Sequence, residues 1–362
     1  MTQLITDART LDALLARLAG ARHVALDTEF TRTRTYYARL ALVQLRVGEE
    51  IACIDPLAFD IAPLLDFLYR PDVLKIVHAG RQDLEVFYDL RGDVPRPVFD
   101  TQIAAAFAGF NDQVGYGALV EALAGVKLPK LYTRTDWEAR PLSEEQLRYA
   151  EDDVRYLPAL HDTLSAKLAA AGRAAWAEQE FAALTDTKLY ANAPADAYRR
   201  VKQGSVLAPA AQAVLQHLAE WREHAAQQQD LPRAWVAPDT ALIELARTQP
   251  ATRAALEQSQ LLPPGALRRW GADVLRAIER GRAAPAAPLW PEARALDAAE
   301  QSLVDRMLQR VRAVAETMQL APAVLASRRT VVELVRAGSG PLTRGWRYEL
   351  LGRELAALRD GA

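Results

Sequence analysis

The sequence predicts an α/β domain with a mixed β-sheet, followed by an all-helical half. Short apolar runs alternate with helical patterns over the first 195 residues, which is typical of α/β domains. Beyond about residue 200 the strand signals stop, and helices separated by proline-containing loops follow. A chain of 362 residues, 50% hydrophobic and 25% charged, is large enough for more than one hydrophobic core.

Five segments of the first half have strand character. Residues 40–47 and 51–55 flank a Gly-Glu-Glu turn, and this spacing predicts an antiparallel hairpin. The other predicted strands are residues 24–30, 75–79 and 98–100. Further along the chain, Ser143 and Gln146 form a predicted capping box, which opens a long helix extending to about Ala171.

The helical half contains an internal repeat. Residues 231–247 align without gaps with residues 320–336, with six identities in seventeen positions. Their spacing predicts a duplicated helical domain, and chance similarity between alanine-rich helices is the alternative. Three prolines within residues 281–291 are typical of a linker. We expect an α/β domain (1–195), a first helical domain (196–282), a linker (283–293) and a second helical domain (294–362).

Composition excludes several classes of protein. Cys53 is the single cysteine, so no intramolecular disulfide can form and a reducing compartment is expected. No apolar stretch approaches the ~20 residues of a membrane helix, and the acidic N-terminus lacks a signal-peptide pattern. These features predict a cytoplasmic protein with no membrane partner. In the helical half, Trp221, Trp235 and Trp270 are expected to fill the core.

Charge is distributed unevenly between the two halves. Residues 197–362 hold 23 Arg and Lys against 17 Asp and Glu, a net charge of +6, which leaves −8 on the first 196 residues. A basic half can face a polyanion. An excess of acids in the other half indicates that carboxylates are concentrated there for some function. The alternative is that +6 over this length is unremarkable.

Three carboxylates in the first half are candidate site residues. Asp27 and Glu29 occupy positions i and i+2 of a predicted strand, so both side chains leave the same face of the sheet. Asp83 lies in the first turn of a predicted helix, where the helix dipole favours an acid. Solvated acids at element ends are the alternative.

A fourth acid and a tyrosine lie on the long helix. Tyr149 and Asp153 are at i and i+4 and share a helix face, whereas Asp152 is rotated by about 100°. Such carboxylates suit Mg²⁺ or Mn²⁺, which prefer oxygen ligands. Two such ions ~3.5–4 Å apart can activate a water and stabilise the leaving oxygen of a phosphoryl displacement. Without metal, crowded acids would repel one another and raise some of their pKa values.

Four ordered motifs carry a family resemblance. They are LDTEF (26–30), HAGRQDLEVF (78–87), FDTQ (99–102) and YAEDDVRYL (149–157). Together they resemble the ribonuclease D family, in the tyrosine subgroup of the DEDD 3′-to-5′ exonucleases, over roughly residues 25–160. The helical half resembles tandem HRDC domains (helicase-and-RNase-D C-terminal). The resemblance implies an RNase H-like exonuclease domain followed by two all-helical HRDC-type domains.

The resemblance also implies a role for each catalytic residue. Asp27 would bridge two metal ions, and Glu29 and Asp153 would hold the ion on the side of the nucleophile. Asp83 would support the second ion through water. Tyr149 would orient the attacking water, because an unperturbed phenol with a pKa of ~10 is a poor proton acceptor.

Seven further residues are candidate substrate contacts. Thr28 and Phe30 flank the metal-binding positions and would touch the terminal nucleotide. His78 would contact a phosphate, and a structural hydrogen bond is its alternative. Residues 127–140 interleave cations and rings, as suits single-stranded RNA, although a solvated loop packed by one tryptophan is equally compatible. The candidates in this segment are Lys130, Tyr132, Arg134 and Trp137.

The leading interpretation is a metal-dependent 3′-to-5′ exoribonuclease that trims structured RNA and releases nucleoside 5′-monophosphates. The resemblance implies tRNA precursors as the main substrate class. A DNA 3′-to-5′ exonuclease and a catalytically silent RNA-binding protein on the same fold are the alternatives. A monomer is expected, because the chain carries its own accessory domains.

Overall fold

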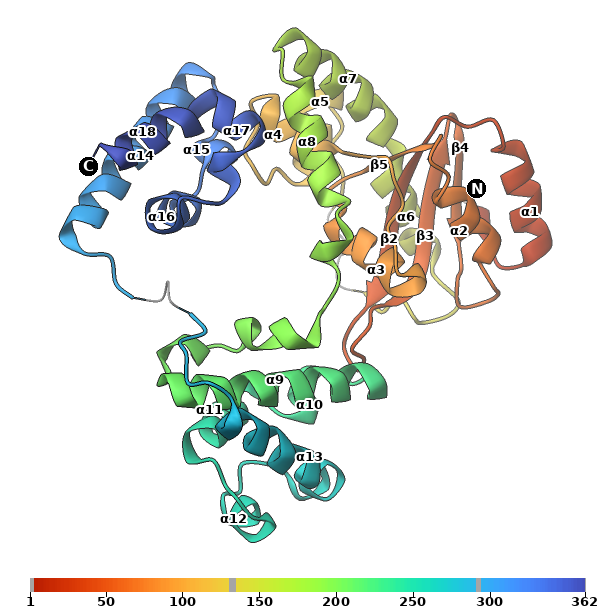
Figure 1. Cartoon of the computed structure of the whole chain (residues 1–362). Coiled ribbons are helices and arrows are strands. Elements are labelled where there is room, and N and C mark those ends of the chain that lie inside the picture. Colours follow the sequence, from red (N-terminus) through yellow and green to blue (C-terminus); the bar gives the residue numbers. More distant parts are fainter. Residues whose placement is uncertain (1–2, 130–134, 291–293, 362) are drawn as a thin grey trace. The chain divides into compact units, whose positions relative to one another are not determined.

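The computed structural model describes residues 3–129, 135–290 and 294–361, which form two compact units (Figure 1). The first unit comprises residues 1–31, 40–190 and 296–362, and the second comprises residues 32–39 and 191–295. The C-terminal helices therefore belong to the same unit as the α/β domain. Each unit has a hydrophobic core of its own.

A six-stranded mixed sheet forms the centre of the first unit, in the order β1-β4-β3-β2-β5-β6. The strands are β1 (Gln3–Ile5), β2 (His23–Thr31), β3 (Arg39–Val47), β4 (Glu50–Ile54), β5 (Leu74–Val77) and β6 (Val98–Asp100). Strands β3 and β4 pair antiparallel, with Val47 opposite Glu50. The pairs β1–β4, β2–β5 and β5–β6 are parallel. The mixed sheet and its hairpin are thus confirmed, whereas β1 was not predicted because three residues show no periodicity.

In the described residues of the α/β part, helices accompany the sheet (Figure 1). They are α1 (Ala8–Arg17), α2 (Ala62–Leu68), α3 (Arg81–Arg91), α4 (Thr101–Phe107), α5 (Tyr116–Ala124), α6 (Glu144–Arg155), α7 (Leu157–Ala170) and α8 (Ala174–Leu184). Helix α6 packs against β2 and β4. This contact brings the late helix to the strand that carries the first two candidate acids.

The predicted long helix begins as expected but is divided into α6 and α7. The Gln146 N–H donates to Ser143 Oγ at 3.2 Å, and the Ser143 N–H donates to Gln146 Oε1 at 2.8 Å, so the capping box is confirmed. Helix α6 ends at Arg155, and α7 begins at Leu157. The prediction of one continuous helix is wrong here, because Pro158 lacks the N–H that a helix interior requires.

The C-terminal helices of the first unit share the core of the α/β domain. They are α14 (Ala298–Thr317), α15 (Pro322–Leu325), α16 (Arg328–Ala337), α17 (Gly345–Arg347) and α18 (Arg353–Asp360). Trp346 is 4% exposed, and its ring centroid lies 5.1 Å from those of Trp176 and Phe107. Its Nε1–H donates to Glu180 at 2.8 Å. This tryptophan therefore joins the two parts of the unit.

The second unit is built on the long helix α9 (Pro209–Gln229). Helices α10 (Arg233–Val236), α11 (Asp239–Thr248) and α13 (Pro264–Ala283) pack against it, and α12 (Arg253–Gln258) packs against α13. The bounds of α10 and α11 recur 89 residues later as those of α15 and α16, at the spacing of the sequence repeat. The domain boundaries after residues 195, 282 and 293 stay predictions.

The expectation that all three tryptophans fill the helical core is wrong for Trp235. Trp221 is 8% exposed and its ring contacts that of Trp270, whereas Trp235 is 57% exposed. Trp235 lies on α10, a helix of one turn, so the neighbouring helices cannot cover every side chain of this short element.

The second unit also holds residues 32–39, which directly follow strand β2. The Tyr36 hydroxyl donates to Glu223 at 2.5 Å, and Asp230 Oδ1 accepts the N–H groups of Tyr36 and Tyr37 at 2.9 and 3.0 Å. The Arg233 guanidinium lies 4.6 Å from the centroid of the Tyr36 ring. This attachment could not be predicted from the sequence, since its partners are nearly two hundred residues apart.

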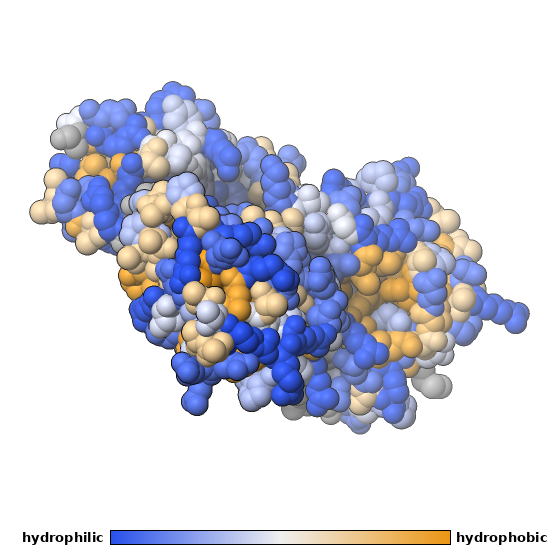
Figure 2. Space-filling view, turned by 60° about the horizontal axis from the view of Figure 1, so that its bottom comes forward, coloured by the Kyte–Doolittle hydropathy of each residue, from blue (hydrophilic) through white to orange (hydrophobic). Residues whose placement is uncertain are grey.

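None of the helices in the described ranges is both long and apolar enough to cross a membrane. The face in Figure 2 is mostly hydrophilic, and its hydrophobic residues form separate patches.

We expect Trp346→Ala to lower the free energy of unfolding of the first unit by about 3–5 kcal/mol, because it empties a filled site in the core. The matched control is Trp235→Ala, which removes an exposed ring and should change stability by no more than about 0.5 kcal/mol. Urea denaturation monitored by circular dichroism measures both values. Equal effects of the two substitutions would contradict the packing described for Trp346.

Candidate active site

Three of the four predicted acids meet over the sheet. Strand β2 presents Asp27 and Glu29 on one face because side chains alternate along a strand, and α6 presents Asp153 toward the same place. One carboxylate oxygen from each residue lies within 4.8 Å of the others. All three side chains are partly buried. This spacing is short enough for the three acids to share a cation.

The fourth acid, Asp83, approaches from the start of α3. It is 8% exposed, and the Thr28 hydroxyl donates a hydrogen bond to its Oδ1. Asp83 is not a member of the group within 4.8 Å, although its charge raises the pKa values of both Asp27 and Asp153. Asp83 therefore lies beside the three-acid cluster, close enough for its charge to repel the carboxylates of Asp27 and Asp153.

The turn that leads into α3 is held by Asp100, a functional residue that the sequence reasoning missed. The Asp100 carboxylate accepts the N–H groups of Ala79 and Gly80 at 3.1 and 2.9 Å. It also caps α4 by accepting the N–H groups of Gln102 and Ile103 at 2.8 and 3.3 Å. An Asp directly before a helix is an N-cap signal, but nothing in the sequence links it to a turn twenty residues earlier.

Burial and mutual repulsion raise the pKa values of the acids. The pKa of Asp27 lies well above its usual value, first because the carboxyl is buried and then because Asp83 and Asp153 repel its charge. Burial, followed by the Asp153 charge, raises the pKa of Glu29 to about 8. Burial raises the pKa of Asp83 to about 6, and burial with the Asp152 charge raises that of Asp153 to about 7.

The donor set fits hard divalent cations. All four groups offer carboxylate oxygens, the donors that Mg²⁺ and Mn²⁺ prefer. Within the described ranges no Lys or Arg forms an ion pair with any of the four acids. A divalent cation would supply the positive charge that these partly buried carboxylates lack.

Tyr149 and Asp153 share a helix face, whereas Asp152 points away from the cluster. The Tyr149 hydroxyl hydrogen-bonds the Asp153 carboxylate. Burial, followed by the Asp153 charge, raises the pKa of Tyr149 above its usual value, so its phenol stays protonated at neutral pH. Asp152 instead accepts a hydrogen bond from Arg155 Nε at 2.8 Å.

The structure does not present Trp137 for stacking on an RNA base. Its side chain is 3% exposed and packs in a small core with Leu42, Cys53 and Leu142. Its ring centroid lies 6.1 Å from that of Tyr149. We therefore correct the substrate-binding prediction: Trp137 is a core residue that packs next to Tyr149. Lys130, Tyr132 and Arg134 lie outside the described residues.

Two of the remaining substrate candidates have structural partners. The side chain of Thr28 is 5% exposed and donates to Asp83, and the Thr28 backbone N–H also hydrogen-bonds the carboxyl groups of Asp27 and Asp83. His78 Nδ1 lies 2.9 Å from Thr101 Oγ1, which itself donates to the Val77 carbonyl. Burial lowers the pKa of His78, although the Asp100 charge opposes this shift. A neutral His78 favours the structural alternative, while Phe30 is half-buried at the end of β2.

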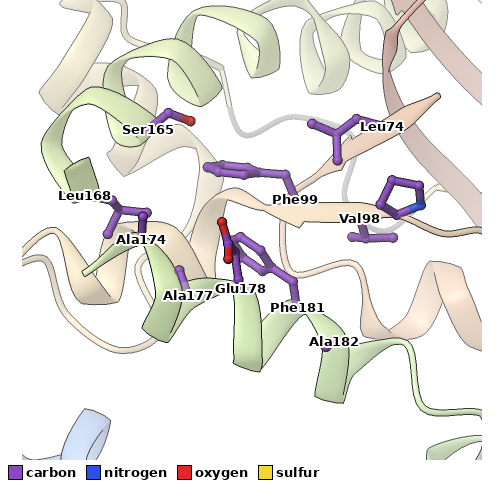
Figure 3. A pocket seen from close by; sticks show the side chains of 11 residues that line it. Leu74, Val98, Phe99, Ser165, Leu168, Ala174, Ala177, Glu178, Phe181 and Ala182 are labelled. Atoms are coloured by element: carbon purple, nitrogen blue, oxygen red, sulfur yellow. The ribbon is translucent and has the colours of Figure 1, made fainter. Parts of the chain in front are cut away.

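A separate apolar cavity of about 460 Å³ lies between β6 and helices α7 and α8 (Figure 3). The rings of Phe99 and Phe181 lie next to one another in it, with centroids 4.9 Å apart. Ser165 and Glu178 are the polar residues of its lining, and none of the five predicted catalytic residues lines it. An apolar cavity with an acidic rim is unsuited to a polyanionic substrate, so the acid cluster is the better candidate.

An acid pair on a strand, an acid at a helix start and a Tyr-x-x-x-Asp helix over a mixed sheet define the class of carboxylate-dependent 3′-to-5′ exonucleases. In agreement, the 3′-5′ exonuclease family matches residues 2–169, and the HRDC domain family matches residues 211–278.

Whole-chain relatives narrow this class. The chain is 37% identical to ribonuclease D of Granulibacter bethesdensis, over 99% of this chain and 92% of the relative. It is 38% identical to ribonuclease D of Nitrobacter hamburgensis, over 99% and 95%. The crystal structure of Escherichia coli RNase D superposes with a TM-score of 0.90 at 34% identity, covering 100% of this chain and 99% of that one. The chain belongs to the ribonuclease D family of exoribonucleases.

The raised pKa values predict the pH dependence of metal-free stability. Glu29, Asp83 and Asp153 hold protons in the folded chain at pH values where the unfolded chain has released them. Stability is therefore fully present below about pH 4 and falls as pH rises to about 8. The melting temperature of EDTA-treated protein should drop by several degrees over this range, and less steeply for Asp27→Asn. A melting temperature that rises over the same range would contradict the burial of these acids.

Thr28→Val tests whether this residue serves Asp83 or the nucleotide. Removing the hydroxyl deletes a hydrogen bond to a carboxylate, so we expect kcat on an RNA oligonucleotide to fall by roughly tenfold with little change in KM. Steady-state kinetics separates the two parameters. An increase in KM at constant kcat would instead assign the Thr28 side chain to substrate binding.

Proposed function

We propose that the chain is a two-metal-ion 3′-to-5′ exoribonuclease that trims the 3′ ends of structured RNA and releases nucleoside 5′-monophosphates. The observation that carries the proposal is the approach of Asp27, Glu29 and Asp153 to within 4.8 Å, contributed by a strand and a distant helix. The cofactors would be two Mg²⁺ or Mn²⁺ ions. Bound ions would lower the pKa of water and stabilise the leaving oxygen of the phosphodiester.

The side chains would divide the work as follows. Asp27 would contact both ions, Glu29 and Asp153 would hold the one beside the nucleophile, and Asp83 would support the other through water. Tyr149 would orient the attacking water with its protonated hydroxyl, since its raised pKa makes it a poor base. Phe30 and the backbone of Thr28 would contact the terminal nucleotide.

The substrate proposal rests on the relatives and on charge. Escherichia coli RNase D is described as an exoribonuclease involved in structured RNA processing, and the ribonuclease D family implies tRNA precursors as the main substrate. The net charge of +6 over residues 197–362 favours association of the helical half with a polyanion.

We further propose a cytoplasmic monomer. Cys53, the single cysteine of the chain, is fully buried, so it offers no surface thiol for an intermolecular disulfide and agrees with a reducing compartment. Size-exclusion chromatography with light scattering tests the oligomeric state.

A time course on a 3′-extended tRNA precursor tests the reaction. We expect stepwise shortening with Mg²⁺, none with EDTA, and a rate lower by roughly 10³-fold or more in Asp27→Asn, because the shared ligand is lost. The matched control is Asp152→Asn, which neutralises a neighbouring acid that pairs with Arg155 and should trim at close to the wild-type rate.

Substrate controls fix the polarity and the sugar preference. An RNA with a 3′-phosphate should resist trimming, and a DNA strand of the same sequence should be shortened more slowly. Full activity of Asp27→Asn would refute the metal assignment. RNA retention without shortening in Mn²⁺ would favour the silent RNA-binding alternative.

A further inference from the structure

Gln44 is buried without a hydrogen-bond partner. Its side chain lies on β3 and is 0% exposed, and neither Nε2 nor Oε1 has a partner among the described residues. An unpaired amide in a protein interior costs free energy, and such groups are rare. A side-chain amide that the fold leaves unpaired at this position calls for a partner other than the described residues.

The Gln44 side chain shares a sheet face with the acid cluster. Strand β3 is the neighbour of β2. Two residues further along β3, Arg46 donates a hydrogen bond to the carbonyl of Arg155, the last residue of α6. Because residues i and i+2 of a strand point the same way, Gln44 also points toward α6. Asp27 points toward α6 as well, since it meets Asp153 there.

The strand on the other side of Gln44 supports this placement. The residue opposite Gln44 on β4 is Cys53. Burial raises the pKa of the Cys53 thiol to about 12, with further contributions from the charges of Glu151 and Asp153 on α6. Gln44 thus lies between β2, the strand that carries Asp27, and Cys53 on β4. The Cys53 thiol is close enough to Asp153 for that charge to raise its pKa.

We propose that Gln44 is a positioning residue for the metal site. In the metal-loaded enzyme its amide N–H donates, directly or through one water molecule, to the carboxylates of the acid cluster. Partners of this kind orient metal ligands, and their removal weakens metal binding by roughly 10–100-fold. This role of Gln44 rests on the proposed two-metal function. It explains why a polar side chain occupies a position where an apolar one would suit the metal-free fold better.

A second buried glutamine provides a matched control. Gln212 is 4% exposed, its Nε2 donates to the Leu207 carbonyl at 2.8 Å, and its Oε1 accepts the Leu289 N–H at 2.7 Å. It lies in the second unit and its amide is satisfied by the chain itself. Gln212 therefore has a purely structural role, against which Gln44 can be compared.

The experiment compares Gln44→Met with Gln212→Met in the full chain. For Gln44→Met we expect a melting temperature in EDTA equal to or above that of the wild type, since an unpaired amide is removed. Its Mn²⁺ affinity, measured by isothermal titration calorimetry, should be weaker by roughly tenfold or more. Gln212→Met should show the reverse: a melting temperature lower by several degrees and unchanged Mn²⁺ affinity.

Wild-type Mn²⁺ affinity in Gln44→Met would overturn the proposal, whatever its melting temperature. A loss of metal-free stability as large as that of Gln212→Met would do the same, because it would assign Gln44 a structural role. Gln44→Leu gives the same two measurements if the methionine variant does not fold. If the wild-type chain binds no Mn²⁺, the proposed two-metal function fails. If the wild type and Gln44→Met bind Mn²⁺ equally well, only the proposed role of Gln44 fails.

Discussion

Repulsion among four carboxyl groups, one buried and three partly buried, is the constraint on which the α/β domain depends. The sheet and its helices hold Asp27, Glu29, Asp83 and Asp153 close together without a basic side chain paired to any of them in the described part of the chain. Left to themselves such groups would separate or keep their protons. A bound cation would reverse this balance, since a ligand that binds only the folded state stabilises it increasingly as the ligand concentration rises above Kd. The stability of the folded α/β domain would therefore depend on cation binding at these four acids.

The side chains around the cluster position the acids and leave their charge unneutralised. Thr28 donates to Asp83, and Asp100 fixes the turn that begins α3. Trp137 packs behind Tyr149. Each of these contacts is made by a neutral group or a backbone N–H, which positions a candidate site residue but supplies no countercharge. An arginine in any of these places would relieve the repulsion and compete with the metal. The absence of such a pair from the described residues keeps the carboxylates available as ligands.

The parts of the site that follow from local geometry could be predicted from the sequence. Strand alternation places Asp27 beside Glu29, and helical spacing separates Asp153 from Asp152. Properties that depend on distant packing could not be predicted. Trp137 lies among cations in the sequence, yet its ring is covered by a core assembled from β3, β4 and α6. The same limit applies to Asp100 and to the attachment of Tyr36, whose partners lie far along the chain.

The two helical segments show how one repeated pattern is used in different surroundings. Helices α10 and α11 recur as α15 and α16 with the same lengths, although the capping residues differ: Pro238 precedes α11, whereas Ser327 caps α16. The side chains diverge where their environments differ. Trp235 on α10 is 57% exposed, whereas the equivalent residue on α15, Val324, is 7% exposed and belongs to the core shared with the α/β domain. A large ring at that position of α15 would overfill the core, while on α10 nothing among its own helices limits its size. Packing against the α/β domain thus accounts for a smaller residue in the second copy.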